Sequence, residues 1–148
     1  MEAAFVIPAL ALLLLLLLQP AIVLYDRAVM GAAAAEGCRL LQTAPADIAQ
    51  NALQGYVERR LGAIPQTDIF HVHAPCTYEI DGQGAEGSEY VSVRIANKLR
   101  PLPIAGSALA LFGGLDGDGL FTVEVEARVR ARAGWVQGSP GSWIGAWK

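Results

Sequence analysis

The chain has 148 residues, 53% of them hydrophobic, and a formal net charge of −3 at pH 7. This length leaves room for one domain beside a membrane segment. The mild negative charge and the lack of a basic cluster in the sequence exclude the pattern that nucleic-acid binding requires, so we expect no nucleic-acid partner. The two cysteines are too few for a disulfide framework or, by themselves, for a zinc site.

The first part of the chain is an uncharged apolar run from Ala3 to Tyr25. About 23 residues at ~1.5 Å rise per residue give roughly 35 Å, enough to cross a ~30 Å hydrocarbon core. Gln19-Pro20 follow the leucine run where a signal peptide would carry small residues, so we expect the segment to stay attached as an anchor. We predict a transmembrane segment over residues 1–25, with Asp26 and Arg27 marking its exit from lipid.

Helix-favouring residues continue to about Thr43, which predicts one long helix whose second half stands outside the membrane. Pro8 and Pro20 each remove a backbone hydrogen bond, so we expect kinks at both. Small side chains in the second half allow another backbone to approach closely: Gly31, Ala32 and Ala35. The sequence leaves two partners open for them, the protein's own sheet and a neighbouring subunit's helix.

A second, shorter helix is predicted from about Pro45 to Leu61. Proline suits the first turn of a helix, Gly62 suits its C-terminal cap, and Pro65 prevents continuation. Near-helical spacing predicts that its buried face holds Ile48, Ala52, Tyr56 and Leu61.

Three later stretches alternate apolar and polar residues with the period of a strand: 67–80, 89–99 and 121–132. The first two are predicted to form a hairpin around a loop at 81–88, and the third has one apolar and one charged face. Asp116–Gly119 is a predicted turn. An antiparallel sheet with one apolar face needs a cover, and the two helices are the available ones.

These elements predict an α+β fold. It combines a long N-terminal transmembrane helix that continues outside the membrane, a second short helix and a small antiparallel sheet of three to four strands. We divide the chain into the membrane segment 1–25, a helix-plus-sheet domain over 26–132 and a Gly/Ser/Trp-rich tail over 133–148. We expect the tail to be loosely ordered.

Cysteines and histidines supply the candidate bonding residues. Cys38 on the long helix and Cys76 on the apolar face of the first predicted strand would point at the same core. They would form either a disulfide or two buried free thiols. His71 and His73 share the other face of that strand, where two exposed histidines without a third ligand are commoner than a metal site.

The sequence contains no motif that indicates catalysis or the binding of a metal or cofactor. Asp116 and Asp118 resemble the start of a calcium loop, but the acidic residue expected at its end is missing, and a hairpin turn is the better interpretation. The sequence has no nucleophile motif, no phosphate-binding glycine loop and no paired buried carboxylates. We therefore expect no enzyme, no cofactor and no metal site.

The head EAAFVIPALALLLLLLLQPAIVLYDRAVMGAAAAEGCRLL resembles the amino-terminal region of TadE-like proteins. These are pseudopilins, or minor pilins, of bacterial tight-adherence (Flp, type IVc) pilus systems. The matching features are Glu2 ahead of a Pro-interrupted leucine run, the aromatic and Arg exit at Tyr25-Asp26-Arg27, and the Ala-rich segment before Cys38. The match covers roughly the first third of the chain. The order of long helix, second helix and small sheet is also similar to pilin-like proteins.

The resemblance implies a single-pass protein of the bacterial cell membrane with its C-terminal domain outside the cytoplasm. Its implied partners are other pilins and pseudopilins, the proteins of the pilus assembly platform, and a prepilin peptidase that removes a leader ending in Gly. Glu2 matches the glutamate that such proteins use in subunit assembly. A carboxylate at the edge of the membrane either rests in the headgroup layer or pairs with a cation, such as a neighbouring subunit's α-ammonium group.

A different class of function fits the same sequence pattern. A single-pass anchored extracytoplasmic binding or adaptor module, unrelated to pili, would also need a retained apolar helix and a small domain. The two hypotheses differ over Glu2, which matters for assembly in the first and has no role in the second.

Overall fold

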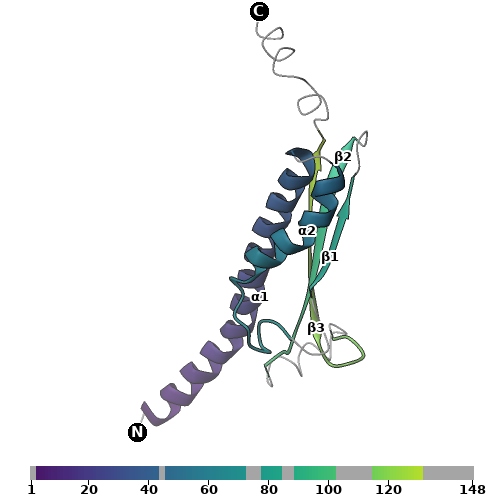
Figure 1. Cartoon of the computed structure of the whole chain (residues 1–148). Coiled ribbons are helices and arrows are strands. Elements are labelled where there is room, and N and C mark those ends of the chain that lie inside the picture. The colour runs from purple at the N-terminus through teal and green to yellow at the C-terminus, as the bar shows by residue number, and fades with distance from the viewer. Residues whose placement is uncertain (1–2, 44–45, 73–77, 85–88, 103–114, 132–148) are drawn as a thin grey trace, which may run out of the picture.

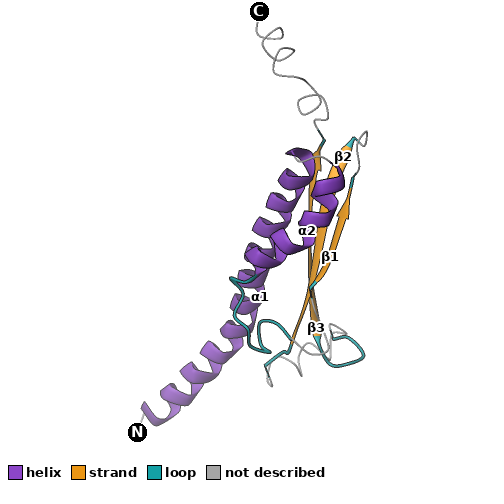
Figure 2. Cartoon of the chain, in the orientation of Figure 1, coloured by secondary structure: helices purple, strands orange, loops and turns teal. Residues whose placement is uncertain are grey.

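A computed structural model describes residues 3–43, 46–72, 78–84, 89–102 and 115–131. Within them the order of elements is α1 (Ala3–Thr43), α2 (Ala46–Leu61), β1 (Glu79–Gln83), β2 (Tyr90–Leu99) and β3 (Phe121–Arg130). The predicted α+β class is confirmed, with two helices and three antiparallel strands in the described part of the chain. Figures 1 and 2 show the N-terminal half of α1 extending away from the other elements.

Helix α1 is one continuous helix, as predicted from its Leu- and Ala-rich sequence. Pro8 and Pro20 both lie inside it. At its end the hydroxyl of Thr43 donates to the carbonyl of Arg39 at 2.9 Å. Such a bond from a threonine hydroxyl to the carbonyl four residues earlier is common in helices.

Helix α2 runs beside the second half of α1 (Figure 1). Its last turn carries Arg59 and Arg60, whose charge suits the C-terminal end of a helix. The Gly62 amide continues the ladder by donating to the Glu58 carbonyl at 3.0 Å.

The predicted buried face of α2 is wrong at Ala52, which is exposed, and correct at Leu61. Burial is described from residue 51 on, so Ile48 lies outside that range. Within it the buried positions of α2 are Leu53, Val57 and Leu61, spaced by four residues, while Tyr56 is half-buried. Leucine and valine bury more apolar area than alanine, so the helix turns this stripe toward the core.

The sheet has the strand order β1-β2-β3, and both pairings are antiparallel. Ile95 stands opposite Ile80 on one side and Val125 on the other, and these three side chains face the helices. The opposite face of the sheet carries charges, with Arg94 donating to Glu124 at 2.6 Å across β2 and β3. One apolar face and one charged face are the arrangement predicted from the alternation.

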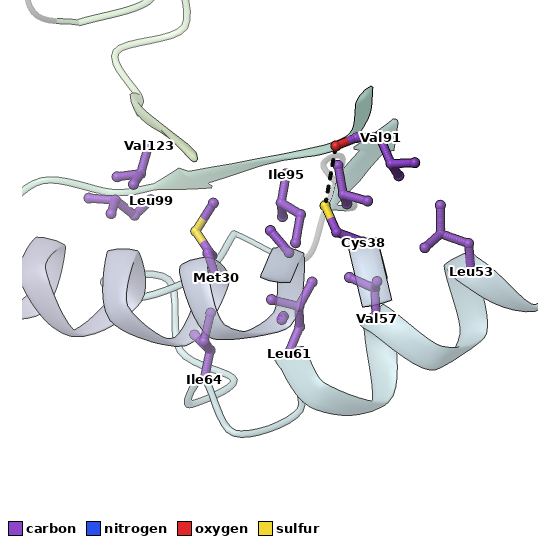
Figure 3. Packing of buried hydrophobic residues seen from close by; sticks show 13 residues of the cluster. Met30, Cys38, Leu53, Val57, Leu61, Ile64, Val91, Ile95, Leu99 and Val123 are labelled. Carbon is purple, nitrogen blue, oxygen red and sulfur yellow. Dashed lines mark hydrogen bonds between the residues drawn. The ribbon is translucent and has the colours of Figure 1, made fainter. Parts of the chain in front are cut away.

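The core lies between the sheet and the two helices (Figure 3). Helix α1 packs on β2 and β3, and α2 packs on α1 and lies against β1. The buried cluster consists of Met30, Ala33, Ala34, Cys38, Leu53, Val57, Leu61, Ile64, Val91, Val93, Ile95, Leu99 and Val123. All of the α1 members belong to its second half, so the globular domain is built on that half alone.

The first strand is shorter and later than predicted. Residues 67–72 are not in a strand, and β1 includes Asp81, Gly82 and Gln83, which we expected in a loop. The amides of Phe70 and His71 both donate to the Thr67 carbonyl at 2.8 Å, which closes a turn. This turn replaces the start of the predicted strand.

Two glycines in β1 and just after it are needed where they stand. A Cβ on Gly82 would overlap Leu53 Cδ2, so its absence lets α2 come close to the strand. Gly84 follows the strand with φ of +116°, and a Cβ there would lie 2.9 Å from the Tyr90 carbonyl oxygen. Glycine adopts this conformation at little steric cost.

Candidate membrane anchor and the polar residues at its base

The first half of α1 exposes nearly all of its side chains. Every residue from 4 to 18 is exposed, and this stretch is almost wholly leucine, alanine and other apolar types. A folded domain in water rarely exposes so large a continuous apolar surface. Among the described residues, α1 is the helix that is long and apolar enough to cross a membrane.

Burial in α1 begins at Gln19 and then follows the period of a helix. The buried positions are Gln19, Ile22, Asp26, Met30, Ala33, Ala34, Gly37 and Cys38. Steps of three and four residues keep these side chains on one face, toward the sheet and α2. The same helix is therefore exposed on all sides before residue 19 and amphipathic after it.

Pro8 lies before the boundary at residue 19, and Pro20 and the small residues Gly31, Ala32 and Ala35 lie after it. Pro8 and Pro20 are exposed. Gly31 is half-buried under the sheet, where an added Cβ would lie 3.8 Å from Val125 Cγ1, whereas Ala32 and Ala35 are exposed on the side away from the core. The structure thus gives Gly31 the protein's own sheet as its partner.

The closest approach along α1 occurs at Gly37, which the sequence analysis did not single out. An added Cβ at Gly37 would lie 3.2 Å from both Leu53 Cδ1 and Val57 Cγ2 and 3.4 Å from Val93 Cγ2. Gly37 is therefore where α1, α2 and β2 meet. Its spacing from Met30 and Ala34 along the helix is the signal that could have identified it.

Asp26 is fully buried, with 0% of its surface exposed. We expected it to mark the exit from lipid, but it occupies the core-facing position four residues after Ile22 and four before Met30. Among the residues that the structure describes, neither carboxylate oxygen has a hydrogen-bond partner. Burial removes the water that would stabilise the charge and raises the pKa of Asp26 to about 7.

Tyr78 belongs to the same buried region. Its hydroxyl also lacks a hydrogen-bond partner within the described part of the chain. Burial first, and then the charge of Asp26, raises the pKa of Tyr78 to about 12. Its ring stacks on His71, with centroids 4.0 Å apart and planes 4° from parallel.

His71 is buried, so the prediction of an exposed strand histidine is wrong. Its Nδ1 lies 2.7 Å from Asn97 Oδ1, and the Asn97 amide donates to the Phe70 carbonyl at 2.8 Å. Asn97 occupies a core-facing position of β2, in line with Ile95 and Leu99. A buried amide with both ends bonded holds the 70–72 segment against β2, because leaving it unpaired would cost about 1–3 kcal/mol.

Cys38 is buried, and within the described residues it forms no disulfide. Its Sγ lies 3.3 Å from the Ala127 carbonyl oxygen and 3.9 Å from that of Val91, the contact drawn in Figure 3. Burial raises the pKa of the thiol, a direction that lowers its reactivity. Cys76 lies outside the described residues, so the predicted pairing of the two stays a prediction.

Other predicted positions fall partly or wholly outside the described ranges. Glu2, His73 and the tail 133–148 lie outside them. Asp116–Gly119 forms the predicted turn, with the Gly119 amide donating to the Asp116 carbonyl at 2.9 Å. Among the residues that the structure describes, no group of three or more His, Cys, Asp or Glu side chains could hold a metal ion.

Comparison with known proteins adds no relative. No protein-family model, no curated protein and no solved structure matches this chain.

Proposed function

We propose that this chain is a TadE-like pseudopilin, a membrane-anchored subunit that takes part in assembling a tight-adherence pilus and has no enzymatic chemistry of its own. The observation that carries the proposal is the division of α1 into an apolar half exposed on all sides and a half that forms the spine of a small α+β domain. A subunit that moves from a bilayer into a helical bundle needs this division.

A lipid bilayer and a pilus fibre both require an apolar surface on the first half of α1. In a membrane, residues 4–18 contact lipid, and in a fibre they contact the equivalent helices of other subunits. Both surroundings are apolar, so leucine suits either one. The second half keeps its buried stripe in both states because it is covered by the protein's own sheet and α2.

The proposal places the protein in the bacterial cell membrane as a single-pass component with the α+β domain outside the cytoplasm. Its partners are other pilins, pseudopilins and the assembly platform. The resemblance of the head, including Glu2, supports this assignment, and the helix that is long and apolar enough to span a membrane is compatible with it.

The test is a substitution of Glu2 in the organism that makes the protein. Glu2→Leu removes the charge that would pair with a neighbouring subunit's cation, and we expect loss of pili and of co-purification with the major pilin. The matched control is Glu79→Ala, an exposed carboxylate on β1 far along the chain from the anchor. We expect normal piliation from it.

Normal piliation in the Glu2→Leu strain, with the protein still in the membrane, would contradict the assembly role. It would favour the anchored binding or adaptor module, which has no use for a charge at that position. Normal piliation after deletion of the whole chain would contradict the proposal more strongly.

A further inference from the structure

An open apolar groove lies where the two halves of α1 meet the loop after α2. It has a volume of about 260 Å³, and it is lined by Leu18, Ala21, Ile22, Tyr25, Pro65 and Phe70. Four of these residues belong to α1, and two belong to the loop that leads from α2 toward β1. One wall of the groove is therefore formed by α1 and the other by the loop after α2.

Hydrogen bonds and ring contacts fix the loop against the helix. The Tyr25 hydroxyl donates to the Ala63 carbonyl at 3.0 Å, and the Tyr25 and Phe70 rings meet edge to face at 87°, with centroids 6.1 Å apart. The Phe70 amide is held by the Thr67 carbonyl at 2.8 Å. The apolar walls are thus preformed.

The length of α1 determines how deep this groove lies in a bilayer. Residues 4–18, exposed on all sides, rise about 22 Å, which is less than a ~30 Å hydrocarbon core. On the side that faces the domain, the apolar surface stops at Gln19, whose side-chain oxygen accepts from the Leu102 amide at 2.9 Å. On the opposite side it continues to Leu24, which is 66% exposed, and Arg27 is the first exposed charge.

Glu2 is the charge that bounds the apolar run on its N-terminal side, so a full crossing by uncharged residues needs the stretch from 19 to 24 as well. Residues 4–24 rise about 31 Å, which matches the hydrocarbon core. Because the domain begins to cover the helix at Gln19, its lower edge must then enter the boundary of the bilayer. The groove between Leu18 and Phe70 lies at that level.

We propose that the lower edge of the domain rests in the membrane and that a lipid acyl chain occupies this groove. Lipid is the occupant that the position favours, because Leu18 belongs both to the groove wall and to the continuous exposed surface of residues 4–18. Tyr25 is part of the groove wall and is 44% exposed, and its hydroxyl is hydrogen-bonded. Aromatic residues are common at membrane boundaries. The inference rests on the membrane anchoring proposed above and does not depend on pilus assembly.

Quenching of tryptophan fluorescence by brominated lipid tests the proposal in the full chain. Trp135, Trp143 and Trp147 are first replaced by Phe. Single tryptophans are then introduced by Phe70→Trp in the groove, by Leu14→Trp in the anchor as the positive control, and by Tyr90→Trp at the start of β2 as the negative control. Each chain is placed in phosphatidylcholine vesicles with and without bromine on the acyl chains.

We expect the Phe70→Trp chain to lose at least twofold more fluorescence than the Tyr90→Trp chain, approaching the Leu14→Trp chain. Gln66→Trp, at an exposed loop position beside Pro65, repeats the measurement without disturbing packing if Phe70→Trp fails to fold. Quenching of Phe70→Trp and Gln66→Trp no greater than of Tyr90→Trp, with Leu14→Trp quenched, would overturn the docking and leave the anchoring intact.

Two further outcomes also decide against the proposal. If Leu14→Trp is not quenched either, the anchoring itself fails. If Phe70→Trp is quenched only after the protein is strongly diluted in lipid, a second copy of the chain fills the groove at working concentrations.

Discussion

The two halves of α1 form one continuous helix but have opposite relations to the rest of the protein. Residues 4–18 are exposed on every side, whereas residues 19–43 bury one helical stripe and expose the other. The difference is due to polar and charged side chains, which occur between the apolar ones in the second half and are absent from residues 4–18. The first half has leucine around its whole circumference, so no face is distinct, and only a uniformly apolar environment satisfies it. The second half places Arg27, Glu36 and Arg39 outside the stripe, which gives it one face for the core and one for water.

The comparison predicts first that shortening a side chain has very different effects in the two halves. Met30 is completely buried, and Met30→Ala should lower the free energy of unfolding of the domain by about 2–5 kcal/mol, because it leaves a cavity. Leu14 is 59% exposed, and Leu14→Ala should change it by less than about 0.5 kcal/mol. Urea denaturation in detergent micelles, followed by circular dichroism, measures both. Similar losses in the two variants would show that the first half also packs on the domain.

The buried carboxyl at Asp26 predicts a pH dependence that a fully apolar stripe would lack. Its pKa is raised from 3.8 to about 7 in the folded chain, so the folded state holds the proton more tightly than the unfolded state. Stability should therefore fall as pH rises from about 4 to about 7 and then level off. The rise in the pKa of Asp26 from 3.8 to about 7 corresponds to a loss of at most roughly 4 kcal/mol in the free energy of unfolding across this pH range.

Asp26→Asn removes this titration. The difference in unfolding free energy between the wild type and Asp26→Asn should shift against the wild type across that pH range. Asp81→Asn, at an exposed position on β1, is the matched control and should keep the wild-type profile. A wild-type profile parallel to that of Asp26→Asn would show that Asp26 gains a partner in solution.

Replacing an exposed residue by a charged one should weaken membrane insertion in the first half of α1 and have little effect in the second half. Leu14→Arg would put a cation near the middle of the bilayer at a cost of about 2.5–3.5 kcal/mol, equivalent to roughly 100-fold weaker insertion. Ala32→Arg, at an exposed position of the second half, should have little effect because that face meets water. Retention of each variant in carbonate-washed membranes gives the answer. Full retention of Leu14→Arg would argue against a membrane-spanning first half.

Much of the fold followed from sequence periodicity. The long helix, the extents of β2 and β3 and the turn at Asp116–Gly119 were predicted close to their observed bounds. Each of these elements has a strong local pattern, either a leucine-rich helical run or strict alternation, so the local and the tertiary preferences agree.

Tertiary contacts decided the remaining elements. Alternation over 67–80 predicted a strand, but residues 67–72 adopt another conformation. The amide of Asn97 donates to the Phe70 carbonyl and the Val72 amide donates to the Lys98 carbonyl, and these bonds hold residues 70–72 in place. The buried face of α2 is the one that carries Leu53 and Val57, because these side chains pack where Gly37 and Gly82 leave space. Neither choice can be inferred from one segment alone, because each depends on a residue more than ten positions away.

By itself, the sequence determined that the chain begins with a helix too apolar for water on any side and continues as an amphipathic helix that needs a sheet. The physical reason is that the hydrophobic pattern along one helix is a local property, readable residue by residue. Only the tertiary structure decided that burial begins at Gln19 and that Asp26 is enclosed with no hydrogen-bond partner from the described residues. These features depend on where the loop after α2 and the sheet close over α1, and burial is a property of the assembled surfaces.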